Sequence, residues 1–338
     1  MQTLRKSANG PIEAVAQDAG SVAWLVASNS QTCNAVHVIG RNQRELTAPQ
    51  PPAGTMTCRW TLTDGQPQLA YAAKKSTALW TLHEGGPAPF DWVLSAKAGG
   101  PERRVERLAH ASNGPGLWLG GIAAAGSTLA YSWVDAEYVD PVGCLSGGSC
   151  KQKIADGGIK IVTKTGDQPL PGAQPALQLA ASAGRIAYIP ALTVKANHPS
   201  ANTNSSIYVV DASSGDTEAK VFVHGIPSAI ALSPHVLAVL TTQAGPHGRI
   251  SWFSATDGTK LGSTLVSRQA APVLAASDQL IVYRANRALY RVSTANGRIR
   301  LLAKVPVNIV GLSLANGRLA WAENKADGTA RLRALSLR

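Results

Sequence analysis

The stretch Ile186-Ala-Tyr188 shows the pattern that decides the fold: an aliphatic residue, a small or β-branched residue, and usually an aromatic one. Seven copies occur along the chain: Val22-Ala-Trp24, Leu69-Ala-Tyr71, Leu129-Ala-Tyr131, Ile186-Ala-Tyr188, Leu237-Ala-Val239, Ile281-Val-Tyr283 and Leu319-Ala-Trp321. From Ala23 to Ala320 the six intervals average about 49.5 residues. A repeat of this length is typical of a four-stranded propeller blade.

Turn residues separate the strands around each copy. A turn signal such as Ala183-Gly184 precedes the pattern, and a hairpin signal such as Ala295-Asn-Gly297 follows the next strand. Each repeat is therefore predicted to contain four antiparallel strands. We predict an all-β, seven-bladed β-propeller; six or eight blades, a long β-sandwich, or two unrelated β domains are the alternatives.

The blades are predicted to form one domain over residues 1–338. Their approximate bounds are 8–48, 55–110, 115–171, 175–223, 226–266, 271–305 and 307–338 together with 1–7. In blade two the innermost strand is expected near Thr55-Met56, and the third strand could be 77–83 or 91–98. The last blade lacks a fourth strand after Leu332-Arg-Ala-Leu335, so residues 2–6 are predicted to supply it and close the ring.

The repeats resemble those of the TolB-type and WD40-like bacterial β-propellers. The stretch Asp211-Ala-Ser-Ser-Gly-Asp216 is similar to the hairpin of quinoprotein-like and YVTN-type blades, whereas the Gly-His and Trp-Asp pairs of eukaryotic WD40 repeats are absent. The resemblance implies the fold and a tendency to bind partners. It implies no particular chemistry, because one fold serves many functions.

Four cysteines indicate the compartment. Cys144 and Cys150 enclose a short loop rich in Gly and Ser, which suits a local disulfide, and Cys33 and Cys58 remain as the second pair. Cys58 is expected near the start of the innermost strand of blade two, on the same face as Cys33. An even cysteine count favours an oxidising compartment, so we predict a secreted or extracytoplasmic bacterial protein whose signal peptide is not in this sequence.

Sequence motifs of catalysis are not found. The chain contains no nucleophile elbow, no phosphate-binding glycine loop and no His-Glu-x-x-His sequence. At the expected starts of the innermost strands Glu13 is the one carboxylate, so a facing pair of acids is not predicted there. The histidines lack metal-ligand spacing, and we predict no catalytic residue, no metal and no cofactor.

Two long loops between second and third strands are the candidate binding site, because loops on a rigid scaffold commonly carry function. They run from Asp135 to Gly158 in blade three and from Lys195 to Ser205 in blade four. Their candidate residues are Asp135, Glu137, Tyr138, Asp140, Lys151, Lys153, Lys195 and His198.

The net charge of +12 is concentrated near the C-terminus. Residues 268–338 contain 12 Lys and Arg but 3 Asp and Glu. The predicted basic patch consists of Arg284, Arg287, Arg291, Arg298 and Arg300. Such a patch attracts polyanions, including nucleic acid in a non-specific way, although a solubilising surface is the alternative.

These features favour a non-catalytic, exported binding or scaffold propeller. The expected partner is a protein or an anionic glycan or polymer, held by one loop-bearing face. No stretch reaches the roughly 20 apolar residues of a membrane span, and a monomer is expected. The alternative is a hydrolase or lyase acting on a polysaccharide through Asp135, Glu137, Asp140 and His198.

Overall fold

The computed structural model describes most of the chain. The described residues are 1–7, 10–26, 35–40, 45–47, 67–84, 89–109, 115–140, 142, 150–195, 198–242, 247–267, 270–305 and 307–337. Within these ranges no helix is long and apolar enough to cross a membrane.

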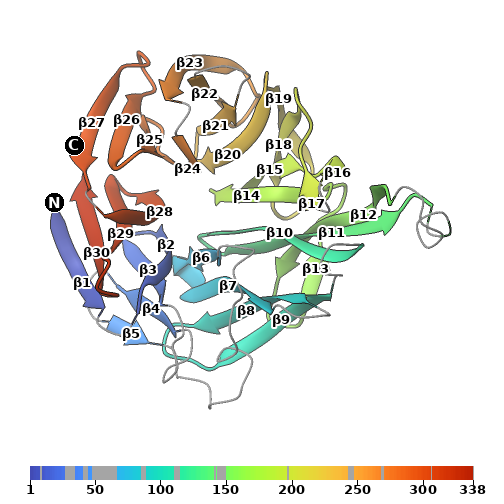
Figure 1. Ribbon diagram of the computed structural model, residues 1–338, viewed down its shortest axis with the longest axis horizontal. Helices are drawn as coiled ribbons and strands as arrows, with labels where there is room; N and C mark the ends of the chain where they lie inside the picture. The colour runs from blue at the N-terminus through green and yellow to red at the C-terminus, as the bar shows by residue number, and fades with distance from the viewer. Residues whose placement is uncertain are drawn as a thin grey trace.

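The described strands form seven four-stranded antiparallel sheets, arranged as blades around a centre (Figure 1). The predicted seven-bladed β-propeller is therefore confirmed. The blades consist of β2–β5 (Ile12–Asp18, Ser21–Val26, Ala35–Ile39, Glu45–Thr47), β6–β9 (Leu69–Ala72, Thr77–Glu84, Phe90–Lys97, Glu102–Ala109), β10–β13 (Gly116–Ala125, Thr128–Tyr138, Gln152–Val162, Asp167–Pro169), β14, β15, β18 and β19 (Ala176–Ser182, Arg185–Pro190, Ser206–Asp211, Thr217–Phe222), β20–β23 (Ile226–Leu232, Val236–Thr242, His247–Ser254, Lys260–Ser267), β24–β27 (Ala270–Ala276, Leu280–Ala285, Ala288–Ser293, Ile299–Lys304), and β28–β30 with β1 (Asn308–Ala315, Arg318–Asn324, Ala330–Ser336, Gln2–Ser7).

The N-terminal strand closes the ring, as predicted. β1 pairs antiparallel with β30, from Gln2 opposite Ala334 to Ser7 opposite Ala330. The two chain ends lie beside each other in Figure 1. Leu4 packs on the buried cluster between blades seven and one, which includes Leu332. Closure therefore uses both backbone pairing and side-chain packing.

The recurring pattern forms the buried second strand in six blades. Its middle residue is fully buried, as shown by Ala23, Ala130 and Ala187, each 0% exposed. The clusters that these strands build lie between neighbouring blades; Trp321 of blade seven, for example, packs with Val282 and Leu289 of blade six. The pattern is therefore the core of the inter-blade contacts.

Blade two departs from the prediction. Its innermost strand is β6, which begins at Leu69 rather than near Thr55, so Leu69-Ala-Tyr71 lies in the first strand. The second strand, β7, carries Ala78-Leu79-Trp80, in which the small and aliphatic residues are exchanged. The two candidate third strands are therefore β7, the second strand, and β8, the third. The innermost strand of blade two does not begin near Cys58, so the expected position of Cys58 on the same face as Cys33 has no strand start to support it. Both cysteines lie outside the described residues.

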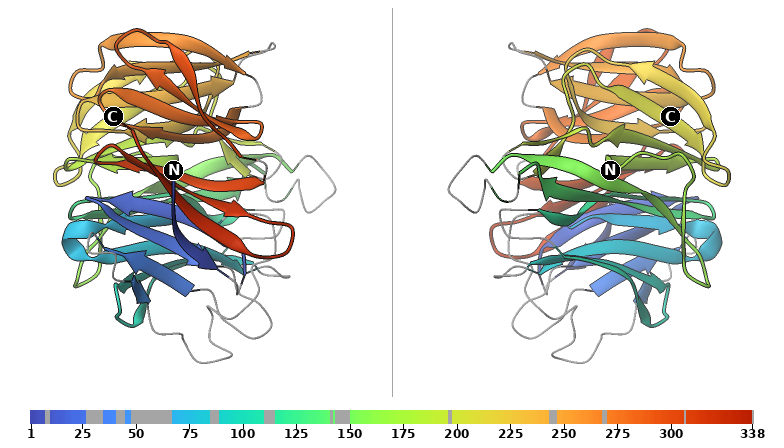
Figure 2. Two further views of the ribbon diagram at one scale, coloured as in Figure 1. Left: turned by 90° about the vertical axis from the view of Figure 1, so that its left-hand side faces the viewer. Right: turned by 90° about the vertical axis from the view of Figure 1, so that its right-hand side faces the viewer.

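The turns divide the molecule into two faces, seen edge-on in Figure 2. The turns from first to second strand and from third to fourth strand share one face, which we call the hairpin face. One of them is the turn from Ser293 to Arg298, where Gly297 has a φ of +69° that favours glycine. The connections from second to third strand share the opposite, long-loop face.

Candidate binding sites on the two faces

The central channel offers little polar chemistry. Its cavity has a volume of about 230 Å³ and is lined by three consecutive residues of the innermost strand of each blade, which lie toward the C-terminal end of that strand in every blade except blade two. Among the lining residues, the polar side chains are Gln17, Tyr71 and Ser313. The Gln17 amide donates to the carbonyl oxygens of Ser313 and Arg318, which ties blade one to blade seven. The channel is therefore built for packing and cross-linking of strands.

Glu13 lies at the start of β2, where a bulge separates Ile12 from Ala14. Burial raises the pKa of its carboxyl group to about 6. Its Oε2 atom is buried without a hydrogen-bond partner. Glu13 does not line the channel cavity. Ionisation of Glu13 is therefore unfavourable, and among the described residues no group that could react with its carboxyl is found beside it.

The long loop predicted for blade three is shorter than expected. Residues from Asp135 to Tyr138 continue strand β11, and residues from Gln152 to Gly158 belong to β12. The paired ends of these two strands project from the body at the right of Figure 1. Five of the candidate residues therefore lie in or next to a hairpin. Asp135, Glu137, Tyr138 and Lys153 lie in its strands, and Lys151 lies just beyond them.

Charges on this hairpin pair with or repel one another. Lys153 forms a 2.9 Å ion pair with Glu137, and both side chains are more than half exposed. Asp135 lies directly opposite Asp156. Burial, followed by the charges of Glu137 and Asp156, raises the pKa of Asp135. Exposed pairs of this kind contribute little binding or stability, and Asp140 lies exposed beyond the strand.

The loop of blade four comes next to this hairpin. Its residues form a small two-stranded sheet, β16 (Thr193–Lys195) and β17 (His198–Ser200), with Lys195 opposite His198. Ile154 of β12 and Val194 of β16 pack on the same buried cluster. The structure therefore brings the two predicted loops together. Binding of a protein or glycan partner at these loops stays a prediction.

Cys150 is disulfide-bonded. Its partner is not among the described residues, since Cys33, Cys58 and Cys144 all lie outside them. The predicted pairing of Cys144 with Cys150 therefore stays a prediction.

The predicted basic patch separates into parts. Arg284 is half-buried, and its guanidinium donates to the carbonyl oxygen of Ile309 in the next blade. Burial lowers its pKa. Arg287 is exposed at the turn between β25 and β26, on the long-loop face. Arg284 therefore links blades, and Arg287 faces away from the remaining three arginines.

Arg291, Arg298 and Arg300 line one pocket of about 290 Å³ between blades six and seven. Arg291 on β26 lies directly opposite Arg300 on β27, and Arg298 lies two residues before Arg300 on the same face. The rest of the lining is Gln279, Leu280, Ser293, Asn296 and Leu337. Among the residues that the structure describes, no carboxylate is part of this lining. Within the described residues no ion pair joins any of the three arginines.

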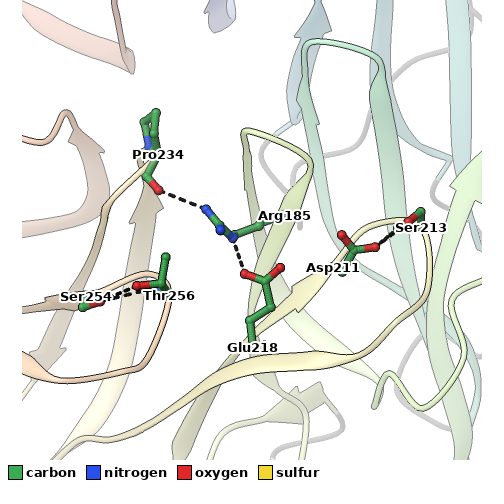
Figure 3. A network of polar contacts seen from close by, with 7 residues as sticks. All are labelled: Arg185, Asp211, Ser213, Glu218, Pro234, Ser254 and Thr256. Carbon is green, nitrogen blue, oxygen red and sulfur yellow. Dashed lines mark hydrogen bonds and ion pairs between the residues drawn. The ribbon is translucent and has the colours of Figure 1, made fainter.

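Blade four treats its arginine differently. The guanidinium of Arg185 pairs with Glu218 and donates to the carbonyl oxygen of Pro234 in blade five, at 3.1 Å (Figure 3). In the next hairpin Asp211 accepts bonds from Ser213 and Ser214, which lower its pKa to about 2. Blade four therefore neutralises its cation with a carboxylate, whereas the blade-six pocket does not.

The sequence carried one signal for this pocket. In the hairpin that turns at Ala295-Asn-Gly297, residue 293 faces 298, so residue 291 must face 300. The grouping of three arginines could be predicted from that turn. Their separation from Arg284 and Arg287 could not, because it depends on the next blade.

No protein-family model and no curated protein sequence matches the chain. Solved structures match its fold. A chain of the mitotic checkpoint complex has a TM-score of 0.55 and 12% identity, covering 99% of this chain and 94% of that one. BamB from Moraxella catarrhalis has a TM-score of 0.49 and 11% identity, covering 98% of both chains. An uncharacterized protein from Listeria monocytogenes EGD-e has a TM-score of 0.49 and 8% identity, covering 96% of this chain and 97% of that one. Identities this low show the fold alone, and the resemblance to TolB-type or YVTN-type repeats is not confirmed.

Proposed function

We propose that this protein is a non-catalytic binding propeller that recognises an anionic glycan or similar polymer through the pocket of Arg291, Arg298 and Arg300. The observation that carries the proposal is the convergence of three arginines on one pocket, where no carboxylate of the described residues forms part of the lining. From the sequence, a loop-bearing face is expected to bind the partner. The arginine pocket lies instead at the third hairpin turn of blade six, on the hairpin face.

Three arginines that line one pocket suit a polyanion. Arg291 and Arg300 are directly opposed across two strands, an arrangement in which like charges repel. An anion between them would remove that repulsion and accept two or more charge-assisted hydrogen bonds. The excess of Lys and Arg after residue 268 would attract such a polymer over a Debye length of roughly 8 Å.

The compartment follows from the cysteines. A disulfide at Cys150 supports an oxidising environment, so we place the protein outside the bacterial cytoplasm. We further expect it to act as a monomer. The loop-built hydrolase stays the alternative: Glu137 is engaged by Lys153, whereas Asp135 and Asp156 face each other as a pair of carboxylates.

Retention on a heparin column at increasing salt tests the proposal. The triple variant R291Q/R298Q/R300Q should elute at clearly lower salt than the wild type. The matched control K260Q/R287Q/K304Q removes the same charge at exposed positions outside the pocket and should elute much closer to the wild type. A K151Q/K153Q variant, in the blade-three hairpin, should also change retention little.

The salt dependence separates a site from a diffuse surface. Loss of three direct contacts should lower the slope of log affinity against log salt by about 2 to 3. Equal losses in the pocket triple and the control triple would mean that the charge only solubilises the protein. Elution of the wild type below physiological salt would reject polyanion binding altogether.

A further inference from the structure

A second basic pocket lies between blades two and three, on the hairpin face. Its volume is about 510 Å³. It is enclosed by the turn between β6 and β7, the turn between β8 and β9, and the turn between β12 and β13. In Figure 1 these two blades are neighbours. The lining residues are Lys74, Lys75, Thr77, Ser95, Ala96, Lys97, Gly100, Pro101, Arg103, Leu129, Val162, Thr163 and Lys164.

Five cations surround this pocket: Lys74, Lys75, Lys97, Arg103 and Lys164. In the part of the chain that the structure describes, none of the five is in an ion pair. Burial, followed by the charge of Lys164, lowers the pKa of Lys75. Lys75 and Lys164 are therefore close enough to repel each other.

Carboxylates near the pocket are occupied or face elsewhere. Asp18 lies behind the β6–β7 turn, where its Oδ2 atom accepts the backbone N–H groups of Ala73 at 2.8 Å and Gly126 at 2.7 Å. Glu102 precedes Arg103 on β9 and, like Asp18, is not part of the lining. The positive charge in the pocket is therefore not balanced from within it.

The floor of the pocket is apolar. Ala96, Leu129 and Val162 are 5%, 3% and 4% exposed and belong to the cores of blades two and three. Arg103 is held over this floor by a 2.7 Å hydrogen bond from its guanidinium to the carbonyl oxygen of Thr163. Thr77, Ser95 and Thr163 add hydroxyl groups. A cationic rim around an apolar floor is complementary to an amphiphilic anion.

We infer that this pocket binds a small organic molecule that carries two or more anionic groups on an apolar body. The apolar floor would take the body, and the lysines would take the phosphate, sulfate or carboxylate groups. The volume lies within the range of small-molecule sites, roughly 300 to 1,000 Å³. The inference is independent of the polymer site, because the two pockets share no residue.

The test uses 8-hydroxypyrene-1,3,6-trisulfonate, a fluorescent trianion with a flat apolar body. Its anisotropy should rise with protein concentration and saturate. The double variant K75Q/K164Q should weaken binding at least tenfold, while the matched control K260Q/K304Q should stay within twofold of the wild type. The polymer-site variant R291Q/R298Q/R300Q should also bind the dye normally, which separates failure here from failure of the proposed function.

Inorganic pyrophosphate tests the role of the apolar body. It should displace the dye at concentrations at least tenfold above the dissociation constant of the dye. Displacement at comparable concentrations would reduce the pocket to a plain anion patch and overturn the inference. Absence of saturable dye binding, or equal weakening in K75Q/K164Q and K260Q/K304Q, would overturn it as well.

Discussion

Gly120→Ala should destabilise the protein because the side chain it adds has nowhere to go. Gly120 lies in the bulge of β10, between Leu119 and Ile122. A Cβ atom there would overlap the carbonyl oxygen of Ala176, in the innermost strand of blade four, and the hydroxyl of Ser132. The obstacle is largely backbone, so side-chain rearrangement alone cannot remove it.

The same bulge anchors three blades. The Gly120 carbonyl accepts the Gln68 amide of blade two at 3.0 Å, and the Gln68 side-chain oxygen accepts the Ile122 N–H at 3.0 Å. The Ser132 hydroxyl donates to the Ala176 carbonyl at 2.6 Å. Moving blade four away to fit a methyl group would strain the Ser132–Ala176 bond, and moving the bulge instead would strain the two bonds to Gln68.

We expect a loss of about 3 kcal/mol, the upper part of the range for overpacked cores. With an unfolding entropy of about 2.1 cal/mol/K per residue, this corresponds to a melting temperature about 4 °C lower for a chain of this length. Thermal unfolding followed by circular dichroism and urea unfolding would measure both quantities.

Gly158→Ala is the matched control in the same blade. A Cβ atom at Gly158 would lie 3.6 Å from the Ala173 carbonyl oxygen, an ordinary contact, so its effect should stay within about 0.5 kcal/mol. If the two variants lost equal stability, the close approach of blades three and four at Gly120 would be wrong.

Two further predictions concern the ring. The free energy of unfolding of the Glu13→Gln variant should increase relative to that of the wild type by up to about 2 kcal/mol as pH rises from 4 to 7.5. A carboxyl group whose pKa in the folded protein is raised from 4.5 to about 6 stabilises the fold below pH 4.5, and this contribution is lost as pH rises through 6. Urea titrations at both pH values that give the same stability difference between the variant and the wild type would contradict this prediction. Deletion of residues 1–7 should lower the melting temperature by several degrees, because it removes the partner strand of β30 and the packing of Leu4. The peptide of residues 1–7, added in trans, should restore part of this loss. An unchanged melting temperature would contradict closure of the ring by β1.

The sequence by itself determined the fold. The strand pattern and its turns are local features, since a hairpin with Gly297 at positive φ requires few distant contacts. In five blades the innermost strand begins at or within one residue of the predicted start of the blade, for example β20 at Ile226. In blade two the prediction failed because Leu69-Ala-Tyr71 fits the pattern better than Ala78-Leu79-Trp80, although the latter is the true second strand.

Only the tertiary structure decided how the side chains are grouped. The predicted loop from Asp135 became strand because it pairs with β12, and Ile154 of that strand packs beside Val194 of another blade. Arg284 is not part of the arginine pocket, because its hydrogen-bond partner, the carbonyl oxygen of Ile309, belongs to blade seven. The second basic pocket, between blades two and three, brings together residues as far apart in the sequence as Lys74 and Lys164. Such groupings depend on how the blades pack, and no local pattern in the chain encodes the distance between side chains on different blades.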